Sequence, residues 1–341
     1  MIIRSKAPLR LGLAGGGTDV SPYSDLFGGA ILNATINLFA YTTIEPRNDG
    51  KIIFESPDRD LKEEYNSSEV LSIEGDFILH KGIYNRIVKD YTHKPLSFKM
   101  ITYVDAPPGS GLGTSSTLMV SILGAFTEWF MLPLGEYEIA NLAYTIERID
   151  LKMAGGKQDQ YAATFGGFNY MEFYKENKVI VNPLRVKQQI QDELSHNLLL
   201  YYTKTNRKSA NIIEKQTENV INKKQSSIEA MHKLKEQSIM MKESILKGNI
   251  DEMGKILDFG WKYKKLMTSG ITNSLLDRIY KCAINTGATG GKVSGAGGGG
   301  FMTFYCPKTT KYGVKKALEE FGGYTQTYGF TNSGLTTWKI Q

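Results

Sequence analysis

Residues 107–116 decide the fold, and their sequence is Pro107-Pro108-Gly109-Ser110-Gly111-Leu112-Gly113-Thr114-Ser115-Ser116. They follow a strand-like run at 96–104 and precede an apolar helical run that begins near Leu118. Glycines let a ligand approach the backbone closely, and the unpaired amides of a first helical turn attract anions. The stretch therefore predicts a polyphosphate site. A capped strand-to-helix connection uses the same residue types and is the alternative on this stretch alone.

Two other phosphate-binding motifs are excluded by inspection. A Walker loop ends in Gly-Lys-Ser/Thr, and no Lys follows Gly113. A dinucleotide fingerprint needs a third glycine where this stretch has Thr114. Residues 295–300 do match the spacing of that fingerprint, but they lead into a strand-like run instead of a helix. This second glycine-rich segment is either a hairpin or a tight wall against a ligand.

The composition sets broad limits on function. The chain has 341 residues, enough for two domains, and a formal net charge of +6 that favours an anionic small substrate. These charges are too dispersed to indicate nucleic-acid binding. The two cysteines, Cys282 and Cys306, show no pairing signature, which fits a reducing compartment. Because no signal peptide and no long apolar run is present, we expect a cytoplasmic protein without membrane contact.

Periodicity along the chain predicts an α+β protein. Strand-like runs lie at 2–13, 30–44, 51–55, 197–203 and 336–340, and helical runs at 77–91, 135–149, 208–247, 250–267, 274–286 and 310–321. Pro183, followed by a charged run, indicates a boundary between a first domain at 1–183 and a second at 184–341.

Four further features could carry chemistry, and each has a plain structural alternative. Gly15-Gly16-Gly17-Thr18-Asp19 ends the first strand, where Asp19 could accept hydrogen bonds from a sugar or merely close a turn. Arg10 is a fixed cation that suits a transferring phosphate but is also a common surface residue. Glu147 lies beside an apolar helical stripe, where the pattern favours exposure to solvent. Asp159 lies between two glycine pairs and could simply cap a short helix.

Three segments, in this order, resemble the motifs of the GHMP kinase superfamily, which contains galactokinase, homoserine kinase, mevalonate kinase and phosphomevalonate kinase. The first is Lys6-Ala7-Pro8-Leu9-Arg10-Leu11 with Gly17-Thr18-Asp19, the second is residues 107–116, and the third is Lys292-Val293-Ser294-Gly295-Ala296-Gly297-Gly298-Gly299. The resemblance covers nearly the whole chain. It favours the phosphate site over the capped connection at 107–116.

The resemblance implies a fold and a set of roles. The fold is two α+β domains, the first ribosomal-protein-like and the second ferredoxin-like, with the active site in the cleft between them. Asp159 would take the acceptor proton, and Arg10 would be the cation of the first motif. Ser115 and Glu147 would hold Mg²⁺. The ATP-binding residues would be Pro108, Gly109, Ser110, Gly111, Leu112, Gly113, Thr114, Ser115 and Ser116, and the substrate-binding residues Gly16, Gly17, Thr18, Asp19, Asp159 and Gly297.

Within the superfamily, the chain is similar to the bacterial D-glycero-D-manno-heptose 7-phosphate kinases. Where galactokinase has Gly-Glu-His before Thr-Asp, this chain has Gly15-Gly16-Gly17, which opens space beside a sugar. The resemblance implies ATP-dependent phosphorylation of the anomeric hydroxyl of the heptose phosphate, with ATP and the sugar phosphate as partners and a homodimer possible. The alternatives are a kinase of an unphosphorylated sugar and a regulator that binds without turnover. Candidates to bind the 7-phosphate, on charge alone, are Lys6, Lys157, Lys204 and Arg207.

Overall fold

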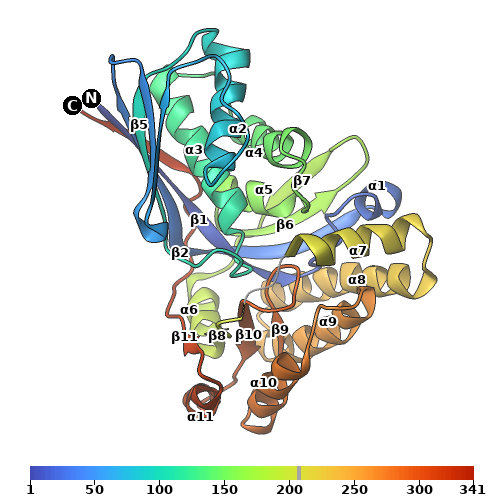
Figure 1. The fold of residues 1–341 in the computed structure, drawn as a ribbon. Coiled ribbons are helices and arrows are strands. Elements are labelled where there is room, and N and C mark those ends of the chain that lie inside the picture. The colour runs from blue at the N-terminus through green and yellow to red at the C-terminus, as the bar shows by residue number, and fades with distance from the viewer. Residues whose placement is uncertain (206–208) are drawn as a thin grey trace.

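The structure, a computed structural model, describes residues 1–205 and 209–341 and contains two sheets (Figure 1). The larger sheet has the central order β12-β1-β2-β5-β3-β4, and β6 and β7 extend it from β2. All neighbouring strands in this sheet pair antiparallel, except that β3 and β5 pair with each other in parallel. Their bounds are β1 (Ile2–Ala14), β2 (Gly29–Pro46), β3 (Lys51–Ser56), β4 (Leu61–Asn66), β5 (Phe98–Val104), β6 (Phe168–Phe173), β7 (Val179–Pro183) and β12 (Thr336–Ile340).

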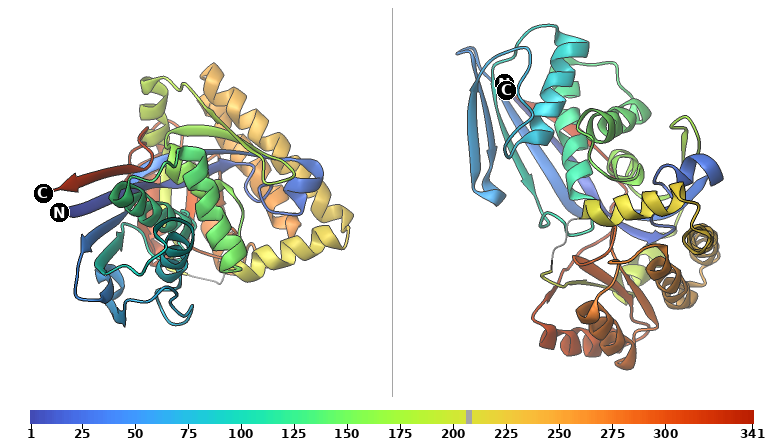
Figure 2. Two further views of the ribbon diagram at one scale, coloured as in Figure 1. Left: turned by 90° about the horizontal axis from the view of Figure 1, so that it is seen from above. Right: turned by 45° about the vertical axis from the view of Figure 1, so that its right-hand side comes forward.

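Helices cover one face of the larger sheet (Figures 1 and 2). They are α2 (Ile78–Ile87), α3 (Thr114–Phe130), α4 (Glu136–Tyr144) and α5 (Gln158–Phe165). Helix α3 contacts β1, β2 and the other three helices. Its side chains are apolar around most of its circumference, and Met119, Leu123 and Phe126 are fully buried. This central packing fixes the N-terminus of α3, which the glycine-rich stretch precedes.

The smaller sheet is antiparallel, with the order β11-β8-β10-β9. Its strands are β8 (Leu198–Tyr202), β9 (Gly290–Val293), β10 (Phe301–Tyr305) and β11 (Tyr324–Thr325). The helices of this half are α6 (Gln188–Asn197), α7 (Ser209–Ile221), α8 (Gln225–Lys247), α9 (Met253–Met267), α10 (Ser274–Asn285) and α11 (Thr310–Leu318). Helix α8 packs on α9 and also contacts β1 and β2, so it joins the two halves.

The predicted two-domain α+β architecture is confirmed, and most predicted elements are present. The predicted boundary falls where β7 ends at Pro183, but the chain later returns to the first half, where β12 pairs with β1. The helix-forming stretch at 208–247 is punctuated in the sequence by Asn222 and Gly248, and it is two helices: α7 ends before Asn222, the chain turns at 222–224 with Lys223 in the left-handed region, and α8 ends before Gly248. The sequence patterns missed β4, β9, β11, α6 and the short helix α1 (Tyr23–Phe27).

A helix that spans a membrane must be both long and apolar. Among the described residues, none of the helices has both the length and the apolar character that crossing a bilayer requires.

Candidate active site

A cavity of about 410 Å³ lies between the two halves of the molecule. The first half contributes the end of β1, the glycine-rich loop with the start of α3, and the residues around Glu147 and Asp159. The second half contributes α7, α9 and the segment at 295–296. All three motif segments of the sequence therefore meet at one cavity, as the cleft predicted between two domains requires.

The glycine-rich loop forms one wall of the cavity. Helix α3 begins at Thr114, not near Leu118 as predicted, so Thr114, Ser115 and Ser116 make its first turn and line the cavity with Gly109, Gly111 and Gly113. The backbone amides of such a turn have no partner within the helix and favour an anion. Among the other residues of this stretch, Pro108 is exposed, whereas Ser110 and Leu112 are buried behind the wall.

Gly111 is the point where two motif segments touch. Its φ is +83°, and a Cβ there would lie 2.6 Å from the carbonyl oxygen of Ser294. A Cβ on Gly295 would in turn lie 2.9 Å from the Cα of Gly111. Only glycine fits this contact, because both the conformation and the space exclude a side chain. The second glycine-rich segment connects the antiparallel strands β9 and β10, so it is the hairpin that its sequence offered as one alternative, and Gly295 of this hairpin packs against the first glycine-rich loop.

Arg10 and Asp159 form an ion pair at the cavity. Arg10 Nε and Nη2 lie 2.7 and 2.6 Å from Asp159 Oδ1, and Arg10 Nη1 donates to the carbonyl of Gly111 at 2.5 Å. Arg10 is 4% exposed, and the Asp159 side chain is 20% exposed. One guanidinium therefore connects the carboxylate at the start of α5 to the glycine-rich loop. Both residues line the cavity, as predicted.

Glu147 is buried, which the helical pattern did not predict. The chain makes a π-helical turn at Thr145–Asp150, and this turn places Glu147 inside (1% exposed) and Ile149 outside (54% exposed). Glu147 Oε1 accepts from Ser115 Oγ at 2.7 Å, and Oε2 accepts from Ser116 Oγ and Gln160 Nε2, both at 2.7 Å. Ser115 and Glu147 are thus adjacent oxygen donors at the cavity wall.

The turn at 15–19 forms another part of the cavity wall. Asp19 is 2% exposed, and its Oδ2 accepts from the backbone N–H groups of Lys157 and Gln158 at 2.9 and 3.1 Å. Burial raises the pKa of Asp19, and the nearby Asp159 carboxylate adds to this effect. Thr18 is fully buried, and its hydroxyl bonds to the carbonyls of Gly15 and Ala30, so its side chain supports the turn. Gly17 and Asp19 line the cavity.

Two lysines, the buried Lys264 and the half-buried Lys292, donate to backbone carbonyls in this turn and just before it, and neither was a candidate from the sequence. Lys264 Nζ donates to the carbonyl of Gly16 at 2.8 Å, and Lys292 Nζ donates to the carbonyl of Gly12 at 2.7 Å. Burial lowers the pKa of Lys264 to about 8 and that of Lys292 to about 7, and the two cations repel each other. Lys264 also lines the cavity. The sequence shows Lys264 only as one lysine of a lysine-rich helical run, so nothing in the sequence marked it as a site residue.

Other candidates lie elsewhere. Gly297 packs against Ile271, while its neighbours at 295–296 line the cavity. Lys6 stacks over the ring of Phe39, and Lys157 is buried 3.5 Å from Asp25. Lys204 is exposed, and Arg207 lies outside the described residues. None of the three described lysines lines the cavity.

Such a cavity can hold the phosphates of a nucleotide along one wall and present an alcohol to a carboxylate on another, which is the task of a small-molecule kinase. Comparison with known proteins gives the family. The model of the GHMP kinases N-terminal domain matches residues 79–167, and that of the GHMP kinases C-terminal domain matches residues 241–323. The chain belongs to the GHMP kinases, and it is an ATP-dependent sugar kinase.

Individual relatives are similar over the whole chain. The chain is 52% identical to the D-glycero-alpha-D-manno-heptose 7-phosphate kinase of Campylobacter jejuni, over 99% of both chains. A crystal structure of a D-glycero-D-manno-heptose 1-phosphate kinase from Bacteroides thetaiotaomicron is 49% identical, with a TM-score of 0.85 over 99% of both chains. The L-fucokinase/L-fucose-1-P guanylyltransferase of Bacteroides fragilis is 26% identical over 88% of this chain and 34% of its own length.

Proposed function

We propose that this protein transfers the terminal phosphoryl group of ATP to the anomeric C1 hydroxyl of D-glycero-D-manno-heptose 7-phosphate. The product is the 1,7-bisphosphate, a precursor of the activated heptose used in surface polysaccharides. The 52% identical relative from Campylobacter jejuni supports this substrate. The observation that carries the reaction type is the Arg10–Asp159 pair, bound to the glycine-rich loop inside a cavity that both halves line.

The phosphates would lie along the first turn of α3. The backbone of Gly109, Gly111 and Gly113 lines the cavity there, and the helix N-terminus favours negative charge. Transfer needs alignment and charge compensation more than covalent help. Arg10 supplies one fixed positive charge beside the loop.

Ser115 and Glu147 fit a role in holding Mg²⁺. They offer two hard oxygen ligands 2.7 Å apart at the cavity wall. Among the described residues, no group of three or more His, Cys, Asp or Glu side chains could hold a metal. Phosphates and water would therefore supply the other ligands, a pattern typical of Mg²⁺ bound with a nucleotide. Held by Ser115 and Glu147, Mg²⁺ would supply positive charge that offsets the charge of the phosphates.

Asp159 is the proposed proton acceptor. As the C1 oxygen forms its bond to the terminal phosphorus, the bond from that phosphorus to the bridging oxygen of ADP breaks, and the hydroxyl proton moves to the carboxylate. Proton loss is late in a loose transition state, so a carboxylate of ordinary basicity suffices. Arg10 fixes one carboxylate oxygen, which orients the group toward the loop.

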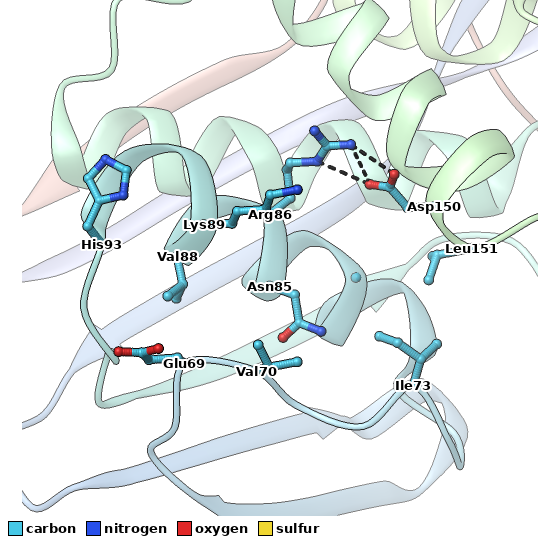
Figure 3. Close-up of a pocket in the computed structure, with 11 residues that line it drawn as sticks. Glu69, Val70, Ile73, Asn85, Arg86, Val88, Lys89, His93, Asp150 and Leu151 are labelled. Carbon is cyan, nitrogen blue, oxygen red and sulfur yellow. Dashed lines mark hydrogen bonds and ion pairs between the residues drawn. The ribbon is translucent and has the colours of Figure 1, made fainter.

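The base of ATP has a second cavity available (Figure 3). This cavity of about 530 Å³ is lined by Val70, Ile73 and Leu151 on its apolar side, and by Asn85 of α2 and Lys89 of the π-helical turn that follows it (Val88–Thr92). Residues 150–151 line this cavity, and their neighbours in the chain, residues 147–148 and 152–153, line the active-site cavity. One turn of chain thus separates the two cavities. We propose that adenine lies in the apolar cavity while its phosphates reach the glycine-rich loop.

The Ile73→Asp variant tests this placement. Ile73 is 41% exposed, so the change should leave the fold intact while placing a charge in the base cavity. We expect the KM for ATP to rise about tenfold, with a smaller change in the KM for sugar. The control, Met131→Asp, changes an apolar residue of 82% exposure outside both cavities. An unchanged KM for ATP in the Ile73 variant would place the base elsewhere.

The runner-up is a C1 kinase of an unphosphorylated sugar, which the similarity to the fucokinase of Bacteroides fragilis favours. The names of the two closely similar heptose kinases also place the phosphate differently, on C7 in one and on C1 in the other. A sugar panel scored for ADP release separates these cases, and phosphorus NMR locates the new phosphate. Faster turnover of free hexoses than of heptose 7-phosphate would reject the proposed substrate. Ligand binding without ADP release would indicate a regulator.

A further inference from the structure

Lys264 lines the cavity beside Gly16 and Gly17, two residues that have no side chains. Its Nζ donates to the carbonyl of Gly16, and a Cβ on Gly17 would lie only 3.1 Å from the same Nζ. Gln216 reaches the same turn from α7, where its Nε2 donates to the carbonyl of Gly17 at 2.8 Å. Two nitrogen donors from two helices therefore converge on two consecutive glycines.

These donors have hydrogen-bonding capacity that the described residues do not use. An ammonium group has three N–H donors and a primary amide has two. Lys264 spends one on Gly16, and among the described residues it has no carboxylate within ion-pair distance. Its side chain is 7% exposed, so solvent compensates little of its charge. A buried cation is normally paired, so an anion bound from the cavity would complete this site.

The buried carboxylates around the cavity already have hydrogen-bond or ion-pair partners other than Lys264. Asp19 accepts from the backbone of 157–158, and Asp159 is paired with Arg10. Glu214 lines the cavity from α7, but it is exposed. A second lysine nitrogen, Lys292 Nζ, lies behind Gly12 and Gly16. The turn at 15–17 is thus the part of the cavity where unpaired positive charge gathers.

We propose that Lys264, assisted by Gln216, binds the phosphate that the sugar carries at the end opposite its reacting hydroxyl. This inference rests on the proposed function, because only a sugar phosphate brings such a group. In the heptose, C7 is the terminus farthest along the chain from C1, so a substrate whose O1 faces Asp159 extends its phosphate away from that residue. A Cβ on Gly16 would meet nothing closer than Lys292 Nζ at 3.9 Å, which leaves space at that residue, whereas the missing side chain of Gly17 lets Lys264 and Gln216 come close to the backbone. Lys264 then determines the preference for the phosphorylated sugar.

The test compares two substrates on matched variants. For each enzyme, kcat/KM is measured with D-glycero-D-manno-heptose 7-phosphate and with the unphosphorylated heptose, and the ratio of the two values is the readout. Lys264→Met removes the charge and retains the stem, whereas Lys264→Arg retains the charge. Lys262→Met is the control, because Lys262 is on the same helix, 69% exposed and paired with Asp258 outside the cavity.

We expect the ratio to fall about 10- to 100-fold in Lys264→Met, the loss typical of a charged hydrogen bond, and to keep its value in Lys262→Met. Lys264→Arg should retain more of the preference than Lys264→Met. If Lys264→Met fails to fold, Gln216→Glu brings a like charge to the phosphate and should lower the same ratio at least tenfold. A wild-type enzyme that discriminates, together with an unchanged ratio in the variants, would overturn this inference alone. A wild-type enzyme that does not phosphorylate the heptose phosphate would overturn the proposed function and this inference with it.

Discussion

Arg10 and Asp159 share one contact point although 149 positions separate them in the chain: two nitrogens of the guanidinium, 2.7 and 2.6 Å away, meet the same carboxylate oxygen. A third nitrogen of Arg10 bonds to Gly111 in the phosphate loop. The cation thus fixes the distance between the proposed base and the proposed phosphate site. In-line transfer depends on such fixed positioning.

Asp159→Asn removes the proton acceptor but keeps the size of the side chain. We expect kcat to fall by a hundredfold or more, with a much smaller change in the KM for ATP, because the group acts in the transition state. Steady-state kinetics with both substrates varied gives the two numbers. Asp192→Asn, an exposed position on α6, is the control. A kcat reduced less than tenfold would exclude Asp159 as the base.

Glu147→Gln keeps the shape of the side chain but removes its charge. Because Glu147 accepts from Ser115 and faces the cavity, we expect the Mg²⁺ concentration for half-maximal activity to rise about tenfold. A Mg²⁺ titration at saturating ATP measures the shift, and chelation should abolish wild-type activity. An unchanged Mg²⁺ requirement would mean that Glu147 serves only to hold α3 and α5 together.

Gly111→Ala tests the contact between the two glycine-rich segments. A side chain in the left-handed region, at a strained contact, costs about 1–3 kcal/mol. The new Cβ would also meet the Ser294 carbonyl, so we expect both a lower Tm and a lower kcat. Gly50→Ala has a similar φ of +69° with nothing within 4 Å and controls for the backbone term. If both variants lost the same amount of Tm and kcat, the contact between residue 111 and the Ser294 carbonyl would contribute nothing to stability or activity.

The charge of Lys264 should set a pH limit on sugar binding. Its pKa is lowered to about 8 by burial, against attraction by Asp19 and with added repulsion from Arg10. Lys292 and the exposed Glu214 also face this region. Below pH 8 the ammonium is charged, and above it the charge is lost as pH rises. We therefore expect kcat/KM for heptose 7-phosphate to fall about tenfold per pH unit above pH 8.

A pH profile of the Lys264→Arg variant is the control, because a guanidinium stays charged throughout this range. The alkaline limb should move to higher pH in that variant. It should also be weaker with the unphosphorylated heptose. The same limb in both enzymes and with both sugars would assign it to another group.

Local sequence pattern predicted most of the elements and the motif residues, but it did not predict the change from α-helical to π-helical geometry within one helix. The stripe at 139–149 assumes 3.6 residues per turn, and a π-helical turn breaks that assumption. As a result, Glu147 was expected to face solvent and is buried. The role proposed for Glu147 came from the resemblance and not from periodicity. The start of α3 was placed four residues late, because Thr114, Ser115 and Ser116 are as suitable for a loop as for a first turn.

Lys264 and Gln216 had no local signal at all. A lysine in a lysine-rich helix resembles a solvated face, and only the packing of α7 and α9 against the turn at 15–17 gives these residues a role. The glycines of that turn predicted open space, but a Cβ would meet the Ala30 carbonyl at Gly15 and Met267 at Gly17, and only Gly16 is free of contacts closer than 3.9 Å. Which side chains enter such space depends on contacts between distant segments, which composition and spacing do not contain.

The most direct measurement is phosphorus NMR of the product formed from ATP and D-glycero-D-manno-heptose 7-phosphate. We expect one ADP per sugar and a second phosphate signal coupled to the anomeric proton, with the original 7-phosphate signal retained. No new anomeric phosphate, under conditions in which the same enzyme phosphorylates a free sugar, would contradict the proposed function.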